Sequence, residues 1–256
     1  MPELYLLESG SIGNIGRAWS TSSLGRPPAS LVNDFQTVRQ LVESGSDVRA
    51  IDWTGCTPLH YACASRVEAQ VKVEYMLQRD ASLVNATNYS ENAVLDPRRG
   101  WSLRRYSTPL HVAAHHGQTD CVKTLVNVGK TPVNATDEHG WTALHLAAEA
   151  GHADAVAVLV QHPDCRVNAT YERGWTALHR AARAGRAKAV EVLVSHPSCD
   201  VSITDKRGHT AADDARYRGR DEIAALIEAK AKGKYTISFT NTVLQTHTMC
   251  SFCYCV

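Results

Sequence analysis

No stretch of this chain is long and apolar enough to cross a bilayer, and its first residues lack the basic and apolar regions of a signal peptide. Net charge is nearly absent as well: 27 basic residues stand against 26 acidic ones, so no overall field attracts nucleic acid or a membrane surface. Glycine-rich phosphate loops and nucleophile elbows are also missing. We therefore expect an intracellular protein, cytoplasmic with the nucleus as an alternative, that is no enzyme and needs no small-molecule substrate, cofactor or metal.

What the chain does contain is a motif that recurs at a fixed distance. The stretch from Gly140 to Gly151, GWTALHLAAEAG, returns almost letter for letter from Gly174 to Gly185 as GWTALHRAARAG. A period of this size is typical of stacked supersecondary units. The threonines that open successive copies lie 34 residues apart, and one more copy opens further upstream: Thr108, Thr142, Thr176 and Thr210, then Thr57.

Each letter of the motif has a physical role in a helix-turn-helix unit. The threonine can cap a helix, because its hydroxyl can accept a hydrogen bond from a backbone N–H group that has no partner in the helix. Ala147 and Ala148 are small enough for neighbouring repeats to approach closely. Gly151 can adopt the left-handed conformation that ends a helix, and Val156 and Leu159 begin the apolar stripe of a second helix. One unit cannot bury its apolar face alone, so stability must come from stacking.

Over residues 30–232 this chain resembles the ankyrin repeat family. The signature of that family is threonine, proline, leucine and histidine, followed by paired alanines and a glycine. The resemblance implies an all-α solenoid of helix-turn-helix units with fingers that resemble β-hairpins. We expect an N-terminal half repeat (30–51), repeats at 52–85, 86–136, 137–170 and 171–204, and a C-terminal cap (205–232). Residues 1–29 are expected to be disordered or loosely ordered, and residues 233–256 to form a tail without repeats.

A histidine occupies the same place in four copies of the motif, which raises the possibility of a metal site or catalysis. A structural role explains the pattern better, because such side chains can hydrogen-bond to backbone or hydroxyl groups of the neighbouring repeat. In the last copy an aspartate, Asp213, stands in this place. The four histidines are His60, His111, His145 and His179.

The finger between the first two full repeats is longer than the others. From Asn85 to Thr108 there are 23 residues, against 8 from Asn134 to Thr142, so this finger carries 15 additional residues. Insertions of this kind fall on one face of a solenoid, commonly the binding face. Arginines alternate here with aromatic residues, a composition typical of contact hot spots, although a solvated loop without a partner is an alternative.

The resemblance implies a non-enzymatic scaffold or adaptor that binds a protein partner through its concave face and fingers. Arginine and aromatic side chains at these places suit an acidic surface on the partner. For the two tryptophans that precede a motif threonine, packing within the fingers is an equal alternative. The residues assigned to partner binding are Trp53, Arg99, Trp101, Arg104, Arg105, Tyr106, His115, His116, Glu138, His139, Trp141, Glu149, Glu172, Arg173, Trp175, Arg183, Lys206 and Arg207.

A rival hypothesis is an adaptor that is tethered to a membrane or associated with nucleic acid through the arginine-rich insertion and the basic residues 230–234. Cys250 and Cys253 have the spacing of a zinc-ligand pair, but a closed structural site needs two more ligands. The last four residues, CYCV, resemble a prenylation box in outline, but its two middle positions should be aliphatic.

Overall fold

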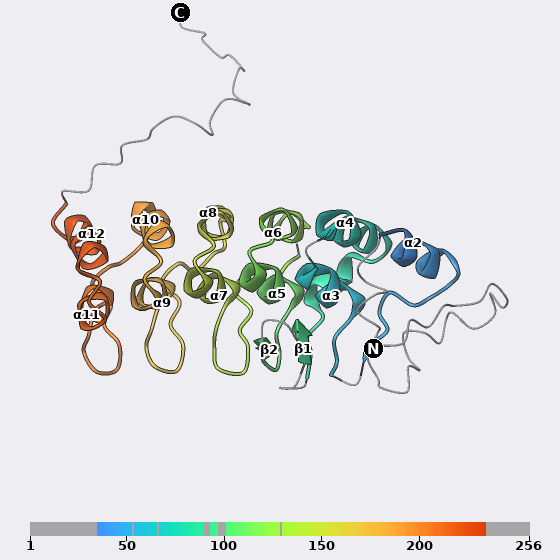
Figure 1. Cartoon of the computed structure of the whole chain (residues 1–256), viewed down its shortest axis with the longest axis horizontal. Coiled ribbons are helices and arrows are strands. Elements are labelled where there is room, and N and C mark those ends of the chain that lie inside the picture. The colour runs from blue at the N-terminus through green and yellow to red at the C-terminus, as the bar shows by residue number, and fades with distance from the viewer. Residues whose placement is uncertain are drawn as a thin grey trace, which may run out of the picture.

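The computed structural model describes residues 35–52, 54–65, 67–89, 93–96, 101–128 and 130–233, with 93–96 and 101–103 described by their backbone alone. Helices in two parallel rows form a solenoid (Figure 1). The row next to the fingers consists of α3 (Pro58–Ala64), α5 (Pro109–His116), α7 (Ala143–Ala150), α9 (Ala177–Ala184) and α11 (Ala211–Tyr217). The second row consists of α2 (Phe35–Glu43), α4 (Ala69–Arg79), α6 (Thr119–Val126), α8 (Ala153–Gln161), α10 (Ala187–Ser195) and α12 (Asp221–Ala231).

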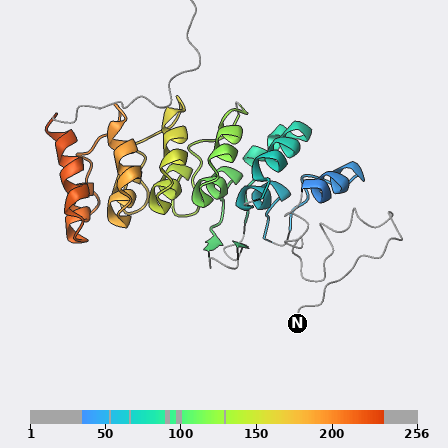
Figure 2. The same ribbon diagram turned by 45° about the horizontal axis from the view of Figure 1, so that its top comes forward.

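Each helix of a row packs against the next helix of the same row and against its own partner in the other row (Figure 2). The motif alanines lie between the helices of the first row and are fully buried, as are Val156 and Leu159 on α8. Close approach of these helices therefore depends on side chains no larger than a methyl group. The all-α repeat solenoid expected from the sequence is confirmed.

Helices α5, α7 and α9 begin and end where the motif predicts, whereas α3 differs and α11 ends at Arg218, one residue before Gly219. Gly117, Gly151 and Gly185 end α5, α7 and α9 in the left-handed conformation, with φ of 68°, 87° and 74°. Helix α3 ends instead at Ser65 in an extended conformation, because the sequence has no glycine there. The chain then enters α4 through Glu68 at a φ of 50°. From Thr57 to Asn85 there are 28 residues against 26 from Thr142 to Asn168, and α4 has 11 residues against 9 in α8, so the second helix accounts for the difference.

The motif histidines form a ladder of hydrogen bonds through the array. In α7 the backbone N–H of Thr142 donates to Nδ1 of His145 over 3.2 Å, and the Thr142 hydroxyl lies 2.9 Å from the same nitrogen. Because Nδ1 accepts, the ring proton is on Nε2, which donates to the carbonyl of Trp175 in the next repeat over 3.2 Å. The same pattern holds at His60, His111 and His179. Their predicted structural role is confirmed.

Burial keeps the ladder histidines neutral. It lowers the pKa of His60 and of His145 to about 4, and it also lowers the pKa of His111 and His179. Asp213 ends the ladder: one carboxylate oxygen accepts from both the backbone N–H and the hydroxyl of Thr210, over 2.9 and 2.6 Å. An aspartate fits this last position because no further repeat of the array offers a carbonyl to a ring N–H.

Asparagine side chains join the loops that follow the second-row helices. Asn134 donates to the carbonyl of Asp164 over 2.6 Å and accepts from the N–H of Arg166 over 2.8 Å. Asn168, one repeat later, makes the same two bonds to Ser198 and Asp200. These contacts join neighbouring loops that lead from the second-row helices to the next finger.

The 15-residue insertion contains a β-hairpin that the sequence pattern did not predict. Strand β1 (Ala93–Asp96) pairs with β2 (Trp101–Leu103) in antiparallel register, with Ala93 opposite Leu103 and an irregularity before Asp96. The hairpin lies beside the fingers, near α3 and α5 (Figure 1). A 3-10 turn, η2 (Ala81–Asn85), leads from α4 toward it.

Candidate partner-binding face

The fingers share one turn, and we name each finger after the first-row helix that follows it. In the α7 finger, Asp137 Oδ1 accepts from the N–H groups of His139 and Trp141, each over 2.9 Å, and its carbonyl accepts from the N–H of Gly140 over 3.0 Å. Asp52 and Asp205 hold the α3 and α11 fingers in the same way. The turns are therefore built by local hydrogen bonds.

Backbone hydrogen bonds also tie neighbouring fingers together. The N–H of Glu138 donates to the carbonyl of Arg105 over 3.1 Å, and the N–H of Lys206 donates to the carbonyl of Arg173 over the same distance. Tyr89, which opens the insertion, donates in the same way to Thr54 over 3.0 Å. The fingers and the first-row helices together form the surface that we call the inner face.

Aromatic side chains fill the space behind the α7 and α9 fingers. Trp141, Tyr171 and Trp175 form a buried cluster with Leu146, in which the tryptophans retain 5% and 6% of their accessible surface. The ring centroids of Trp141 and Tyr171 lie 5.0 Å apart, and those of Tyr171 and Trp175 lie 6.1 Å apart. The indole N–H of Trp175 donates to Asp205 over 2.9 Å. Both tryptophans therefore pack within the fingers, as the alternative interpretation had it.

Guanidinium groups alternate with these indole rings across the inner face. The Arg104 guanidinium carbon lies 4.0 Å from the Trp141 ring centroid, and that of Arg180 lies 4.3 Å from the same ring. Arg180 also lies 5.3 Å from the Trp175 ring, and Arg183 lies 4.9 Å from it. Contacts of this kind are attractive, because the face of an aromatic ring carries negative charge. We call these five residues the guanidinium–indole row.

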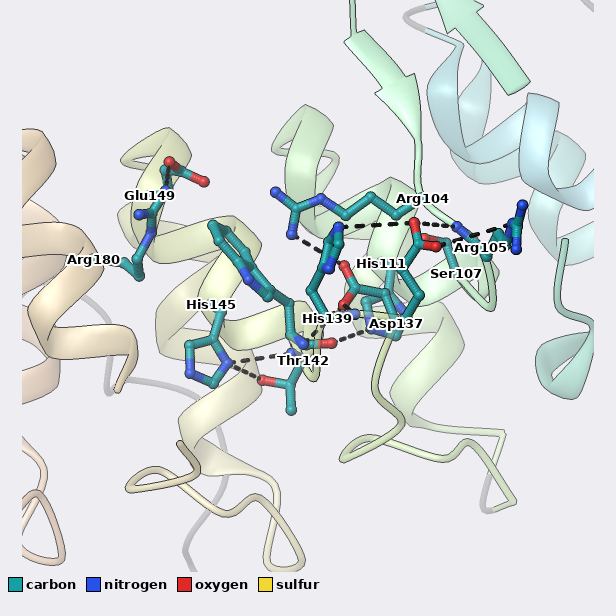
Figure 3. A network of polar contacts seen from close by, with 12 residues as sticks. Arg104, Arg105, Ser107, His111, Asp137, His139, Thr142, His145, Glu149 and Arg180 are labelled. Carbon is teal, nitrogen blue, oxygen red and sulfur yellow. Dashed lines mark hydrogen bonds and ion pairs between the residues drawn. The ribbon is translucent and has the colours of Figure 1, made fainter. Parts of the chain in front are cut away.

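Each guanidinium of the row has its own carboxylate. Arg104 Nη1 lies 3.2 Å from Asp137, Arg183 Nη1 lies 3.6 Å from Asp214, and Arg180 pairs with Glu149. Figure 3 shows the pairs of Arg104 with Asp137 and of Arg180 with Glu149. The three arginine side chains are still 30%, 16% and 27% exposed in the order Arg104, Arg180, Arg183. Because a guanidinium has five N–H donors, each arginine keeps donors for a further ligand.

Burial affects the ionisation of this row unequally. It lowers the pKa of Arg180 to about 10, and the charges of Arg104 and Arg183 add to the effect. Arg180 therefore remains charged at neutral pH. Burial also raises the pKa of Asp214, although the nearby His179 and Arg183 act in the opposite direction. Arg104 and Arg183 therefore also belong to the framework, because these pairs bridge neighbouring repeats.

The other residues that the sequence assigned to binding are distributed along the same face. The N–H of Arg105 donates to Glu138 over 3.1 Å, and His139 Nε2 lies 3.9 Å from the same carboxylate. His115 and His116 lie edge to face at the end of α5, and burial with the neighbouring His116 lowers the pKa of His115 to about 3. A groove of about 600 Å³ separates the α9 and α11 fingers, and its lining is Glu172, Arg173, Trp175, Asp205, Lys206 and Arg207.

Some assignments lie beyond what the structure describes. Trp53 and Arg99 fall outside the described residues, and Trp101 is described by its backbone alone. The cysteines of the C-terminal patterns, Cys250 and Cys253, also fall outside. Within the described ranges no three His, Cys, Asp or Glu side chains are grouped to hold a metal ion. In the same ranges no helix has the length and apolar character that a membrane span needs.

The central residue of the row, Arg180, is absent from the sequence-based assignment. The sequence did contain a signal for Arg180: the residue after the motif histidine differs in every repeat, and Arg180 occupies this position. Recognising it would have required the expectation that this position faces the fingers and not the core. The residues at this position in chain order are Tyr61, Val112, Leu146, Arg180 and Asp214.

Comparison with known families now adds to the geometry. A family model described as ankyrin repeats (3 copies) matches residues 87–171 and 163–236, and a second, described as ankyrin repeat, matches residues 54–89. The chain belongs to the ankyrin repeat family. Its array is a protein–protein interaction domain, and ankyrin repeats are typically not enzymes.

One curated ankyrin relative is NF-kappa-B inhibitor alpha of Sus scrofa. It is 34% identical to this chain over 112 residues, which make up 43% of the chain and 31% of the relative. The matched part is thus about a third of the relative's own length. Inhibition of NF-kappa-B is a property of that relative, stated in its name.

Proposed function

We propose that this ankyrin array is an intracellular scaffold or adaptor whose inner face binds an acidic segment of a protein partner. The observation that carries the proposal is the guanidinium–indole row. Indole rings hold the three guanidinium groups in place, so little side-chain entropy is lost when a partner binds. Carboxylates of the partner would accept hydrogen bonds from the donors that the internal pairs leave unused.

The internal carboxylates do not cancel this preference. The Asp137 side chain has no exposed surface, and that of Asp214 retains 6%, whereas Arg104 and Arg183 are 30% and 27% exposed. A partner approaching the row therefore meets the cationic member of each of these two pairs. Glu149, the carboxylate that pairs with Arg180, is 37% exposed, so a partner could also reach this acidic side chain.

The rival function, binding of nucleic acid or a membrane by the arginine-rich insertion, receives less support. Arg104 and Arg105 belong to that insertion, and both are paired with carboxylates of the α7 finger. Flat indole rings that could stack with bases are buried in the cluster. Among the described residues, the row therefore offers charge to a phosphate backbone but no exposed indole face to its bases.

A binding measurement tests the proposal. Labelled poly-glutamate should bind the array at about 0.15 M salt, and weaken as salt is raised, because exposed charges are then screened. Arg104→Gln combined with Arg183→Gln should weaken binding by roughly 100-fold or more, since two charged hydrogen bonds worth about 1.5–3 kcal/mol each are lost.

The matched control is Arg166→Gln. Arg166 is exposed on the loop that follows α8, and none of the ion pairs among the described residues includes it. Its substitution changes net charge without touching the row, so it should alter affinity by less than about twofold, because a distant exposed charge is largely screened at this salt concentration. Equal loss in both variants would mean that net charge, and not the row, binds the polymer. Tighter binding of a single-stranded oligonucleotide than of poly-glutamate would favour the rival function.

A further inference from the structure

Tyr106 occupies a backbone position where the other fingers have glycine. Its φ is 61°, and the glycines at the equivalent positions have φ of 84°, 82°, 76° and 81°. The same hydrogen bond is made each time: the N–H of Tyr106 donates to the carbonyl of Asn88 over 2.9 Å, as Gly140 does to Asp137 over 3.0 Å. The four glycines are Gly55, Gly140, Gly174 and Gly208.

The surrounding structure holds Tyr106 in this left-handed conformation. The fully buried Asn88 side chain accepts from the N–H of Ser107 over 2.8 Å, and the carbonyl of Arg105 accepts from Glu138 over 3.1 Å. A side chain in this region of φ is unfavourable relative to glycine, because Cβ lies too close to the backbone. The ring of Tyr106 gives no packing in return, since it is 56% exposed. Strain of this kind is most often retained at sites of function.

A second tyrosine lies on the neighbouring segment. The peptide group between Asn88 and Tyr89 bonds on one side to Tyr106 and on the other to Thr54, so the two tyrosines stand on adjacent segments. Tyr89 is 52% exposed, yet its ring is fixed: its hydroxyl donates to the carbonyl of Asp52 over 3.2 Å. The ring also covers Gly55, where an added Cβ would lie 2.4 Å from it.

We propose that Tyr89 and Tyr106 form an aromatic anchor site for an aromatic side chain on the partner's acidic segment. This inference rests on the proposed function and gives the partner a second chemical feature. Tyr89, held by its hydroxyl, and Tyr106, on a backbone held by its neighbours, offer a large contact area, and aromatic rings pair with one another in stacked or edge-to-face arrangements. Arg105, with 48% of its side chain exposed, stands next to Tyr106 in the chain and favours carboxylates beside that aromatic residue.

The test compares two polymers and three proteins. The polymers are poly-glutamate and a random copolymer of glutamate and tyrosine; the proteins are the wild-type chain, Tyr106→Gly and Tyr106→Ala. Wild-type protein should bind the copolymer about 10-fold more tightly than the homopolymer, the gain typical of one stacked aromatic pair. Both variants should lose that gain and bind poly-glutamate as the wild type does.

The two variants separate the ring from the backbone. Tyr106→Gly removes the ring and the strain, whereas Tyr106→Ala removes the ring and keeps a Cβ in the left-handed region. The glycine variant should therefore melt above the alanine variant by about 2–4 °C, while the two bind equally. Equal melting temperatures would contradict the backbone part of the inference.

The failures can be told apart. Variants that keep the full preference for the copolymer would overturn the anchor site and leave the acidic-partner function standing. A wild-type protein that binds neither polymer would overturn both. Poly-glutamate binding that survives loss of Arg104 and Arg183, together with a tyrosine-dependent gain, would keep the anchor and reject the row.

Discussion

The α5 finger and the later fingers of this array share one framework but present different side chains. Where the α7, α9 and α11 fingers present Glu138, Glu172 and Lys206, the α5 finger presents the exposed Tyr89. Where the late fingers have glycine, the α5 finger has Tyr106. The turn and the histidine ladder are the same on both sides of this division. Stability and recognition therefore depend on different positions of the same repeat, so the exposed side chains can change without a change of fold.

The largest expected effect tests whether the framework is equally stable before and after the α5 finger. Leu59→Ala and Leu178→Ala should each lower the free energy of unfolding by about 2–5 kcal/mol, because both leucines are buried and their removal leaves a cavity. Chemical denaturation measures the change, and Glu191→Ala, on the exposed side of α10, is the control. A small loss at Leu59 beside a large one at Leu178 would show that the early half is less tightly packed.

The histidine ladder predicts a pH dependence shared by both halves. A ladder histidine has a folded pKa of about 4 and an unfolded pKa near 6.5, so between these values the unfolded chain binds the proton and the folded chain does not. Stability is therefore complete above pH 6.5 and is lost as pH falls toward 4, by up to about 1.4 kcal/mol per pH unit for each histidine.

Substitution of one ladder histidine sharpens this prediction. His60→Gln and His145→Gln should each make the pH dependence between 6.5 and 4 shallower by the contribution of one group, about 3 kcal/mol in total at pH 4. Glutamine keeps an acceptor for the threonine N–H and a donor for the next repeat. Urea denaturation at several pH values gives the slopes. An unchanged slope for His60→Gln would mean that the insertion disturbs the ladder beside it.

A charge reversal tests the contact between the α5 finger and the α7 finger. Arg104→Glu places a carboxylate beside the buried Asp137 and removes the contact with Trp141, so it should destabilise the array by about 1–3 kcal/mol. Arg173→Glu, on the exposed part of the α9 finger, should change stability by less than about 0.5 kcal/mol. Thermal unfolding distinguishes them, and equal effects would remove Arg104 from the framework.

The smallest effects are expected when the residues at the positive-φ position of the α5 and α7 fingers are changed. Tyr106→Gly should stabilise the array by about 1 kcal/mol, and Gly140→Ala should destabilise it by a similar amount, because both positions require a positive φ. Opposite shifts in melting temperature are the expected result. Shifts of the same sign would show that the two turns are not equivalent.

The sequence predicts the framework well because each framework residue acts through a local rule. Threonine caps, paired alanines and terminal glycines follow from helix geometry, and the 34-residue period brings equivalent residues into register. The surface follows no such rule. Arg180 and Leu146 occupy equivalent positions, yet one lies between two indole rings and the other joins the buried cluster, which depends on side chains from two fingers.

The insertion shows the same limit. Its position at the tip of the α5 finger can be read from spacing, but its hairpin cannot, because Ala93–Asp96 and Trp101–Leu103 are too short to show a clear alternation. The role of Tyr106 was equally hidden. The aligned motif shows a tyrosine in place of glycine, but only the shared hydrogen bond and the positive φ show that the turn is retained.

The most direct test of the central claim is to locate a bound acidic polymer on the protein by NMR. The labelled array would be titrated with the glutamate–tyrosine copolymer while the side-chain N–H signals of arginine and tryptophan are followed. Signals of Arg104, Arg180 and Arg183 and of the Trp175 indole should shift together, whereas that of Arg166, on the loop after α8, should not. Shifts at Arg166 with no change along the guanidinium–indole row would contradict the claim that the inner face recognises an acidic partner.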